Sequence, residues 1–264
     1  MKAIAKQALI IGATGGIGRE ITERLYKMGF DPISAGRDPK KLMTLTRILG
    51  SNATYFVADI TNYDQIHHGL LMHRDRRRKD GLENNLQVVV NASGVLRLND
   101  SLESLEQCID VNLIGTHNTL KLAEEFIEDD GHVGVISSAA SLLTLPGKFG
   151  SYAASKAAVN TLCNHARISR ALRVKNVSVT VSYPQIVETA MANSVEAKEH
   201  DVFKVFPHYD PKVVAKKIVD DMLTGKRSSF LSRRDQLLAF VARVAPVTFE
   251  RLTLRYIEQK LRTR

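Results

Sequence analysis

Residues 8–18 read Ala8-Leu9-Ile10-Ile11-Gly12-Ala13-Thr14-Gly15-Gly16-Ile17-Gly18. The four apolar residues that come first predict a short buried strand, and the helical spacing of Ile17, Ile21 and Leu25 predicts a helix directly after the glycines. Glycines between a strand and a helix allow a tight turn and let the backbone approach a pyrophosphate closely. The N–H groups at the start of the helix face the same anion. We therefore expect a dinucleotide at this loop rather than an ordinary strand-to-helix turn.

Strand and helix patterns alternate along the rest of the chain. Further strands are predicted at 33–35, 54–57, 86–90, 133–136, 177–181 and, more weakly, 228–231. Helices are predicted at 17–28, from Asp38-Pro39 onward, and at about 105–127, 152–173 and 213–223. Strands joined by helical crossovers indicate an α/β fold, a doubly wound parallel sheet of about seven strands with helices on both faces. We expect one domain, 1–232, followed by a helical extension, 233–264.

Composition bounds the class of protein. The chain has 264 residues, 44% of them hydrophobic, which suits one large domain with a sizeable core. Its two cysteines cannot build a disulfide framework, and Cys108 and Cys163 are both expected in helices, buried and reduced. The apolar run at 8–11 is too short for a signal peptide, and no stretch approaches the ~20 apolar residues of a membrane span. We therefore expect a soluble, cytoplasmic protein.

The net charge of +9 raises the question of an anionic partner. One basic run holds Arg74, Arg76, Arg77, Arg78 and Lys79, and we interpret it as a solvated loop. No nucleic-acid motif accompanies the run, so we expect no nucleic-acid partner, and a nucleic-acid binder is the weaker hypothesis.

The end of the second predicted strand bears on the choice of cofactor. It reads Ser34-Ala35-Gly36-Arg37. An acidic residue near this point would accept hydrogen bonds from an adenosine ribose hydroxyl, as in NAD binders, but Gly36 holds that position. The Arg37 guanidinium that follows can pair with a 2′-phosphate through two hydrogen bonds. The sequence therefore favours NADP(H) over NAD(H).

Tyr152 and Lys156 lie four residues apart in a predicted helix, so both project from one face. A tyrosine hydroxyl has a pKa near ~10, and a neighbouring ammonium lowers it. A tyrosine with a lowered pKa suits acid–base catalysis on an alcohol or a carbonyl. The spacing alone arises often by chance on a solvated helix surface, so it needs support from other residues.

That support comes from a resemblance. The spacing Gly-x-x-x-Gly-x-Gly, with Tyr152-x-x-x-Lys156 further along, resembles the short-chain dehydrogenase/reductase family over about residues 7–232. The resemblance implies a Rossmann-like fold and a catalytic set of Asn112, Ser138, Tyr152 and Lys156. It also implies cofactor contacts in chain order. These are Gly12, Thr14, Gly15, Gly16, Ile17, Gly18, Arg37, Asp59, Ile60, Asn91, Gly94, Tyr152, Lys156, Pro184, Val187 and Thr189.

The chain departs from the family pattern in three places. Gln185 stands where a glycine usually follows the proline, and Asn91-Ala92-Ser93-Gly94 lacks the second asparagine of the family element. The interval from the serine to Tyr152 is one residue longer than usual. Ser137 and Ser141 therefore remain alternatives to Ser138.

The resemblance implies hydride transfer between a nicotinamide and the carbonyl carbon of a small-molecule ketone or aldehyde. Ser138 would hydrogen-bond the carbonyl oxygen, and Tyr152 would give it a proton. Lys156 would lower the pKa of Tyr152 and hold the nicotinamide ribose, and Asn112 would support a water that returns protons to Lys156. A non-enzymatic NADP(H)-binding sensor or assembly subunit is the alternative, and it would be expected to lack one of these side chains. We also expect a homodimer or homotetramer.

Apolar residues near the predicted site suggest a lipid-like or bulky substrate, such as a 3-oxoacyl, retinoid or steroid type, although each could simply pack the core. They are Val95, Leu96, Leu142, Leu143, Leu145, Met191, Val195, Val202, Phe203, Val205 and Phe206.

The extension 233–264 carries eight Lys/Arg and three Asp/Glu, a local charge of +5, and Pro246 is expected to divide it into two helices. Such a segment could contact an anionic membrane, pack on the core or another subunit, or dock an acidic acyl carrier.

Overall fold

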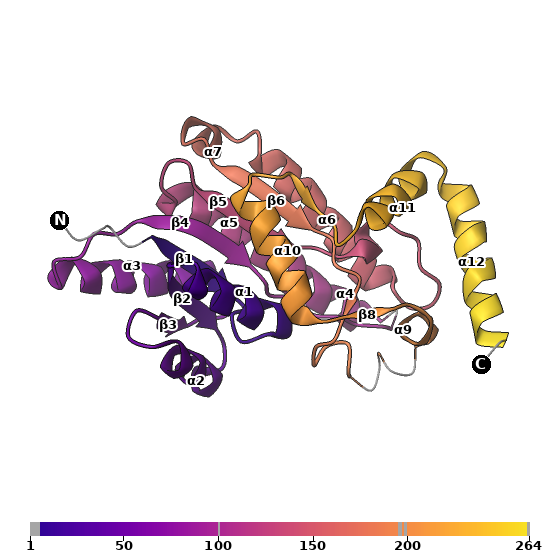
Figure 1. Cartoon of the computed structure of the whole chain (residues 1–264), viewed down its shortest axis with the longest axis horizontal. Helices are drawn as coiled ribbons and strands as arrows, with labels where there is room; N and C mark the ends of the chain where they lie inside the picture. Colours follow the sequence, from indigo (N-terminus) through magenta and orange to yellow (C-terminus); the bar gives the residue numbers. More distant parts are fainter. Residues whose placement is uncertain (1–5, 100, 195–196, 198–199, 263–264) are drawn as a thin grey trace.

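The computed structural model describes residues 6–99, 101–194, 197 and 200–262, and it contains a seven-stranded parallel sheet (Figure 1). The strand order is β3-β2-β1-β4-β5-β6-β9, and every pairing is parallel. The strands are β1 Gln7–Ile11, β2 Asp31–Gly36, β3 Thr54–Val57, β4 Leu86–Asn91, β5 His132–Ile136, β6 Ser178–Ser182 and β9 Ser228–Ser229. The predicted doubly wound sheet is confirmed.

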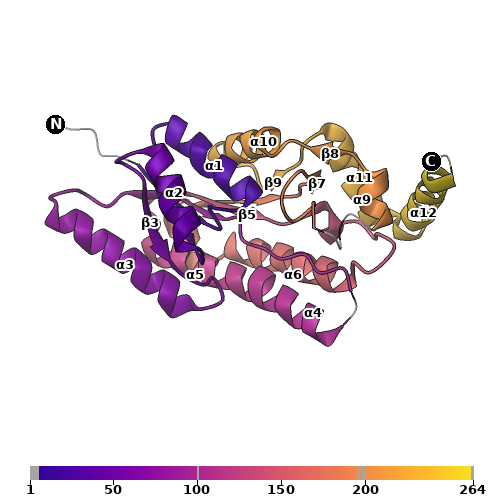
Figure 2. The same cartoon turned by 90° about the horizontal axis from the view of Figure 1, so that it is seen from below.

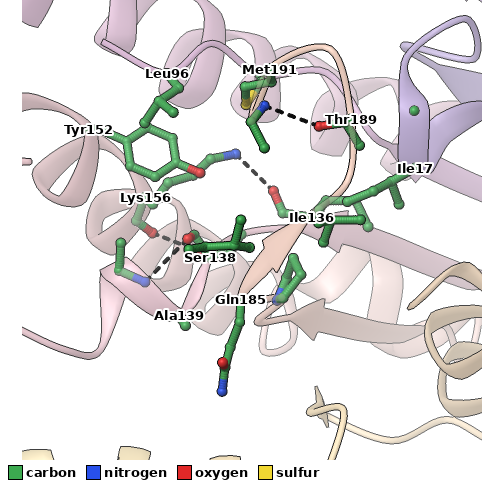
Figure 3. A pocket seen from close by; sticks show the side chains of 18 of the residues that line it. Ile17, Leu96, Ile136, Ser138, Ala139, Tyr152, Lys156, Gln185, Thr189 and Met191 are labelled. Atoms are coloured by element: carbon green, nitrogen blue, oxygen red, sulfur yellow. Dashed lines mark hydrogen bonds between the residues drawn. The ribbon is translucent and has the colours of Figure 1, made fainter. Parts of the chain in front are cut away.

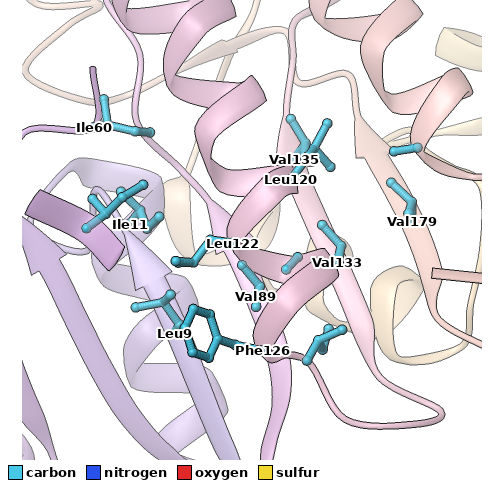
Figure 4. Packing of buried hydrophobic residues seen from close by; sticks show 14 of the residues in the cluster. Leu9, Ile11, Ile60, Val89, Leu120, Leu122, Phe126, Val133, Val135 and Val179 are labelled. Atoms are coloured by element: carbon cyan, nitrogen blue, oxygen red, sulfur yellow. The ribbon is translucent and has the colours of Figure 1, made fainter. Parts of the chain in front are cut away.

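Helices cover both faces of this sheet, and Figure 2 shows α1 and α10 on one side with α3, α4, α5 and α6 on the other. The helices of the sheet domain are α1 Gly16–Lys27, α2 Pro39–Leu49, α3 Tyr63–Lys79, α4 Leu102–Cys108, α5 Gly115–Phe126, α6 Gly150–Ala166, α7 Arg170–Val174 and α10 Pro211–Leu223. Because successive strand side chains point to opposite faces, β1 divides its residues between two cores. Leu9 and Ile11 pack with α3, α5 and α6 (Figure 4), whereas Ala8 and Ile10 pack with α1 and α10.

Two predicted helices are shorter and more divided than expected. The predicted helix at 105–127 is α4, a π-helical segment at Ile109–Ile114, and α5. The predicted helix at 152–173 ends at Ala166, and α7 begins after Ser169, whose hydroxyl caps it by accepting the Leu172 N–H at 3.4 Å. Cys108 and Cys163 are buried in helices, as predicted.

The prediction of a solvated loop at Arg74–Lys79 is wrong, because this run forms the last turns of α3. Its arginines have partners that anchor the helix. The Arg77 guanidinium lies 3.5 Å from the Asp31 carboxylate, and that of Arg74 lies 5.2 Å from the centre of the Phe126 ring. Positive charge at a helix C-terminus is also favourable because it opposes the negative end of the helix dipole.

The sequence patterns missed three short elements after β6. They are β7 Ile186–Val187, α9 Asp201–Val205 and β8 His208–Tyr209, and β7 pairs with β8 in a small separate sheet. Two residues of β7 or β8 are too few to show an alternating pattern.

The C-terminal residues form α11 Arg233–Val244 and α12 Pro246–Arg262, so the predicted division at Pro246 is confirmed. Ser232 caps α11 by accepting the Asp235 N–H at 3.1 Å, and the Asp235 carboxylate accepts the Ser232 N–H at 3.1 Å. The boundary at 232/233 between a domain and an extension stays a prediction. None of the helices within the described residues is long and apolar enough to cross a membrane.

The first prediction concerns the packing of α1 on the glycine loop. A Cβ at Gly18 would lie 2.1 Å from the Gly12 carbonyl oxygen, whereas one at Gly15 would lie 3.4 Å from the same atom. We expect Gly18→Ala to lower the free energy of unfolding by about 1–3 kcal/mol because backbone must shift, and Gly15→Ala to change it by less than about 1 kcal/mol. Urea denaturation of both variants without added cofactor tests this. Equal losses would show that the Gly12–Gly18 approach is not the constraint.

Candidate active site

A cavity of about 840 Å³ lies at the carboxyl ends of β1, β4, β5 and β6. One end reaches the glycine loop and Arg37, and the other is bordered by residues of α11 and α12. Open parallel sheets bind their ligands at this edge, where the chain reverses its direction of winding. The cavity therefore brings together, from distant parts of the sequence, most of the residues predicted for the site.

The glycine loop is shaped by close contacts at Gly12 and Gly16 that leave no room for a side chain. Gly12 has φ +84°, and a Cβ there would lie 2.7 Å from the Ser93 N. A Cβ at Gly16 would lie 2.3 Å from the Thr189 Cγ2. Thr14, Gly15, Gly16 and Ile17 line the cavity with Gly12, but Gly18 does not. Gly18 lets α1 pack on the loop, and its predicted contact with a cofactor stays a prediction.

Arg37 lies at the cavity wall after β2, and its side chain is 70% exposed. Its Nη1 lies 4.0 Å from the Asp59 carboxylate, a distance at which the guanidinium keeps its hydrogen-bonding capacity for an incoming anion. Asp59 and Ile60 line the same end of the cavity. The Asp59 carboxylate also accepts hydrogen bonds at 2.9 Å from the N–H and the hydroxyl of Thr61.

Asn91 and Gly94, both predicted to contact the cofactor, have different positions. Asn91 is buried; its amide donates to the Thr116 hydroxyl and its oxygen accepts the Ser93 N–H, both at 2.9 Å. It therefore shapes the loop and does not line the cavity. Gly94 does line it.

Tyr152 and Lys156 project from α6 into the cavity (Figure 3). The Lys156 ammonium donates to the Ile136 carbonyl at the end of β5, at 2.9 Å, and burial lowers its pKa to about 8. Burial raises the pKa of Tyr152, and its hydrogen bond with Ser138 opposes the shift by less. Desolvation of the phenolate sets the direction of this shift, and Lys156 is not among the groups that contribute to it. The predicted effect of Lys156 on the pKa of Tyr152 stays a prediction.

Of the three candidate serines, Ser138 lies beside Tyr152 at the cavity. Its hydroxyl accepts the Ala140 N–H at 3.2 Å, borders the cavity and hydrogen-bonds Tyr152. Ser137 is buried, and its hydroxyl donates to the Asn160 amide oxygen at 2.7 Å. The Ser141 hydroxyl donates to the Ser138 carbonyl at 2.6 Å.

Asn112 is fully buried in the π-helical segment and does not line the cavity. Its side chain pairs with the Val95 backbone, accepting the N–H at 2.8 Å and donating to the carbonyl at 3.0 Å. A Cβ at Gly94 would lie 3.1 Å from the Asn112 oxygen and 3.2 Å from the Lys156 Nζ. Asn112 therefore holds the loop after β4 close to Lys156.

The segment after β6 contributes Pro184, Val187 and Thr189 to the cavity, as predicted. Gln185, the departure from the family pattern, donates to the Asp235 carboxylate in α11 at 2.5 Å. Sequence reasoning missed this link. The Ser232-to-Asp235 spacing could have indicated that a helix begins at this point, but not that Asp235 contacts Gln185.

Several apolar residues border the far end of the cavity. The predicted ones that do so are Val95, Leu96, Leu143, Leu145, Met191, Val202, Phe203 and Phe206. Leu142 and Val205 pack against core clusters instead, and Val195 lies outside the described residues. The C-terminal helices add wall residues that the sequence analysis did not assign to the site. They are Arg234, Asp235, Leu238, Val241, Phe249, Leu252, Thr253 and Tyr256.

Comparison with known proteins agrees with this geometry. A family model described as short chain dehydrogenase matches residues 6–200. A 3-hydroxyacyl-CoA dehydrogenase type-2 of Drosophila melanogaster is 27% identical over 202 residues, 72% of this chain and 78% of that protein. Oxidoreductase UcpA of Escherichia coli (strain K12) is 26% identical over 242 residues, 88% of this chain and 89% of that protein.

A solved structure shares the fold. The crystal structure of a short chain dehydrogenase from Burkholderia cenocepacia J2315 in complex with NADP superposes with a TM-score of 0.75 at 20% identity, covering 96% of this chain and 99% of that one. Because the family model spans the sheet from β1 through β6, the chain belongs to the short-chain dehydrogenase family, and it is an oxidoreductase.

Proposed function

We propose that this protein reduces a ketone or an aldehyde to an alcohol with NADPH, and that the substrate is apolar. One observation carries the proposal. The glycine loop, the Tyr152–Lys156 pair and an apolar wall border the same cavity, so a dinucleotide and a carbonyl compound could bind end to end within it.

The residues present fit a nicotinamide dinucleotide. The closely packed glycines leave backbone N–H groups for a pyrophosphate, and the exposed Arg37 guanidinium suits a 2′-phosphate. The Burkholderia cenocepacia enzyme of the same fold was crystallised with NADP, which supports this choice. When bound, the nicotinamide would supply the hydride.

Side chains of the protein would supply the proton and stabilise the negative charge that develops on the carbonyl oxygen. Because burial raises its pKa, Tyr152 stays protonated at neutral pH and can donate its proton to the carbonyl oxygen. The Ser138 hydroxyl, beside that of Tyr152, would donate a hydrogen bond to the same oxygen as negative charge develops there. Lys156 would hold the ribose hydroxyls near the nicotinamide, and Asn112 would keep the loop that carries Gly94 in place.

The substrate class follows from the far wall. Phe203, Phe206 and Phe249 border it, and most of the other residues there are apolar, with Arg234, Asp235, Thr253 and Tyr256 among them as polar groups. A ketone or an aldehyde attached to a long apolar group, such as a 3-oxoacyl chain, fits this lining best. The curated relative named as a 3-hydroxyacyl-CoA dehydrogenase is consistent with a substrate of that kind.

The first test removes the proposed proton donor. Tyr152→Phe keeps the ring but not the hydroxyl, so kcat/KM for carbonyl reduction should fall by at least ~100-fold while the Kd for NADPH changes little. A panel of aldehydes and ketones graded by chain length, assayed by NADPH consumption, provides the measurement, and a fluorescence titration provides the Kd. Retained turnover in this variant would rule out Tyr152 as the acid.

A second test concerns cofactor choice. Arg37→Ala should raise the Kd for NADPH by about tenfold or more and that for NADH by much less, because only NADPH carries the 2′-phosphate. Arg47→Ala, an exposed arginine on α2 away from the cavity, is the matched control. Equal losses for the two cofactors in Arg37→Ala would count against the assignment.

A third test uses pH. Lys156, with a pKa of about 8, is charged below that pH and loses its proton above it. We expect kcat/KM for reduction to be flat from about pH 6 to 7.5 and to fall as the pH rises past about 8. Oxidation of the alcohol needs an unprotonated Tyr152, whose pKa is raised, so it should increase throughout this range. Cofactor affinity measured at each pH separates binding from chemistry, and a reduction rate that stays flat up to pH 10 would contradict the assignment.

A further inference from the structure

Helix α11 exposes large apolar side chains on its outward side. Leu237, Phe240 and Val244 are each 60% exposed, and their spacing of three and four residues places them in one row along the helix. The buried residues of the same helix, Asp235 and Ala242, lie on the opposite side. The outward row is therefore not explained by packing within the chain.

Arginines flank this row. Arg233, Arg234 and Arg243 are exposed, and none of them forms an ion pair with another of the described residues. Residues 233–262 contain seven Lys/Arg and three Asp/Glu, a local charge of +4. Asp235 accepts a hydrogen bond from Gln185, and Glu250 accepts one from Thr144. We call Leu237, Phe240, Val244 and the three arginines the outer face of α11; Arg234 lies at its edge and also borders the cavity.

Helix α12 extends the apolar surface. It adds Val247, Leu252, Leu254 and Tyr256, each at least 42% exposed, so α11 and α12 carry seven of the 20 exposed large apolar side chains in the described part of the chain. Figures 1 and 2 both place α12 at one end of the molecule, beyond the sheet. Apolar surface concentrated in this way marks a site of interaction.

We propose that the outer face of α11 docks on an anionic membrane surface. An amphipathic helix that lies in a lipid interface combines a row of Phe and Leu with flanking Arg or Lys, and this face has both. Anionic headgroups complement the three arginines, while the apolar row enters the boundary of the acyl chains. A second copy of the chain is a poorer occupant, because a two-fold interface on this face would bring the arginines of both copies together.

The cavity lies close to the proposed membrane-docking face of α11. Arg234, Leu238 and Val241 of the same helix border the cavity, and Leu252 and Tyr256 of α12 border it while partly exposed. Docking through α11 would thus place the C-terminal wall of the cavity next to lipid. The docking proposal itself does not rest on the proposed reaction, since its test measures binding and not turnover.

The experiment is co-sedimentation of the full-length protein with vesicles. We expect binding to phosphatidylcholine vesicles that contain about one third phosphatidylserine, little binding to pure phosphatidylcholine, and severalfold weaker binding at high salt. The double variant Leu237→Ser/Phe240→Ser should reduce the partition coefficient by at least ~10-fold. Arg233→Gln/Arg243→Gln should reduce it by about fivefold for each arginine removed.

Matched controls on α2 replace side chains of similar exposure away from this face. Ile48→Ser and Arg47→Gln should leave vesicle binding unchanged. Circular dichroism and thermal melting check that each variant is folded, and sedimentation velocity reports its mass. Equal binding to neutral and anionic vesicles, or outer-face variants that bind as the wild type does, would overturn the proposal. So would a loss of oligomer in those variants without a loss of vesicle binding, or binding to a polyglutamate chain without binding to vesicles.

Discussion

The buried ammonium of Lys156 is the constraint on which the site depends. A charge removed from water needs a polar partner, and the Ile136 carbonyl at the end of β5 provides one at 2.9 Å. That contact fixes α6 against the carboxyl edge of the sheet, and Tyr152, one turn earlier on the same helix face, is thereby set beside Ser138. A pKa of about 8 leaves Lys156 close to losing its proton, so the same burial that orders the site also makes its charge sensitive to pH.

Glycines at two close contacts also determine how the loops around the cavity pack. Gly94 lies against both Lys156 and Asn112, and Gly16 lies against Thr189 in the segment after β6. Each glycine lets two distant parts of the chain meet without an intervening Cβ. The glycine loop is thus held by the loops after β4 and β6. These two loops also border the far, apolar end of the cavity.

The sheet could be predicted from the sequence because its strands are apolar runs separated by turn residues, and the glycine loop has a definite place after the first of them. The catalytic positions were predictable through the family resemblance, although their roles stay predictions. What local patterns could not show depends on distant contacts: the anchoring of Arg77 by Asp31, the two-residue strands β7 and β8, and the net effect of burial on Tyr152. Spacing reveals that a lysine is near a tyrosine, but not how much water the fold removes from both.

The contacts of the C-terminal helices are a further example of distant contacts that local sequence patterns do not show. Gln185 lies in the segment after β6, and its amide donates a hydrogen bond to Asp235, a capping residue of α11. The start of α11 is therefore tied to the segment after β6, and Leu238 and Val241 on its inner side border the cavity. The row of Leu237, Phe240 and Val244 lies on a different side of the helix from Leu238 and Val241, which border the cavity, and it is exposed. Gln185, which stands where the family usually has a glycine, thus connects the segment after β6 to the helix whose outer face we propose meets lipid.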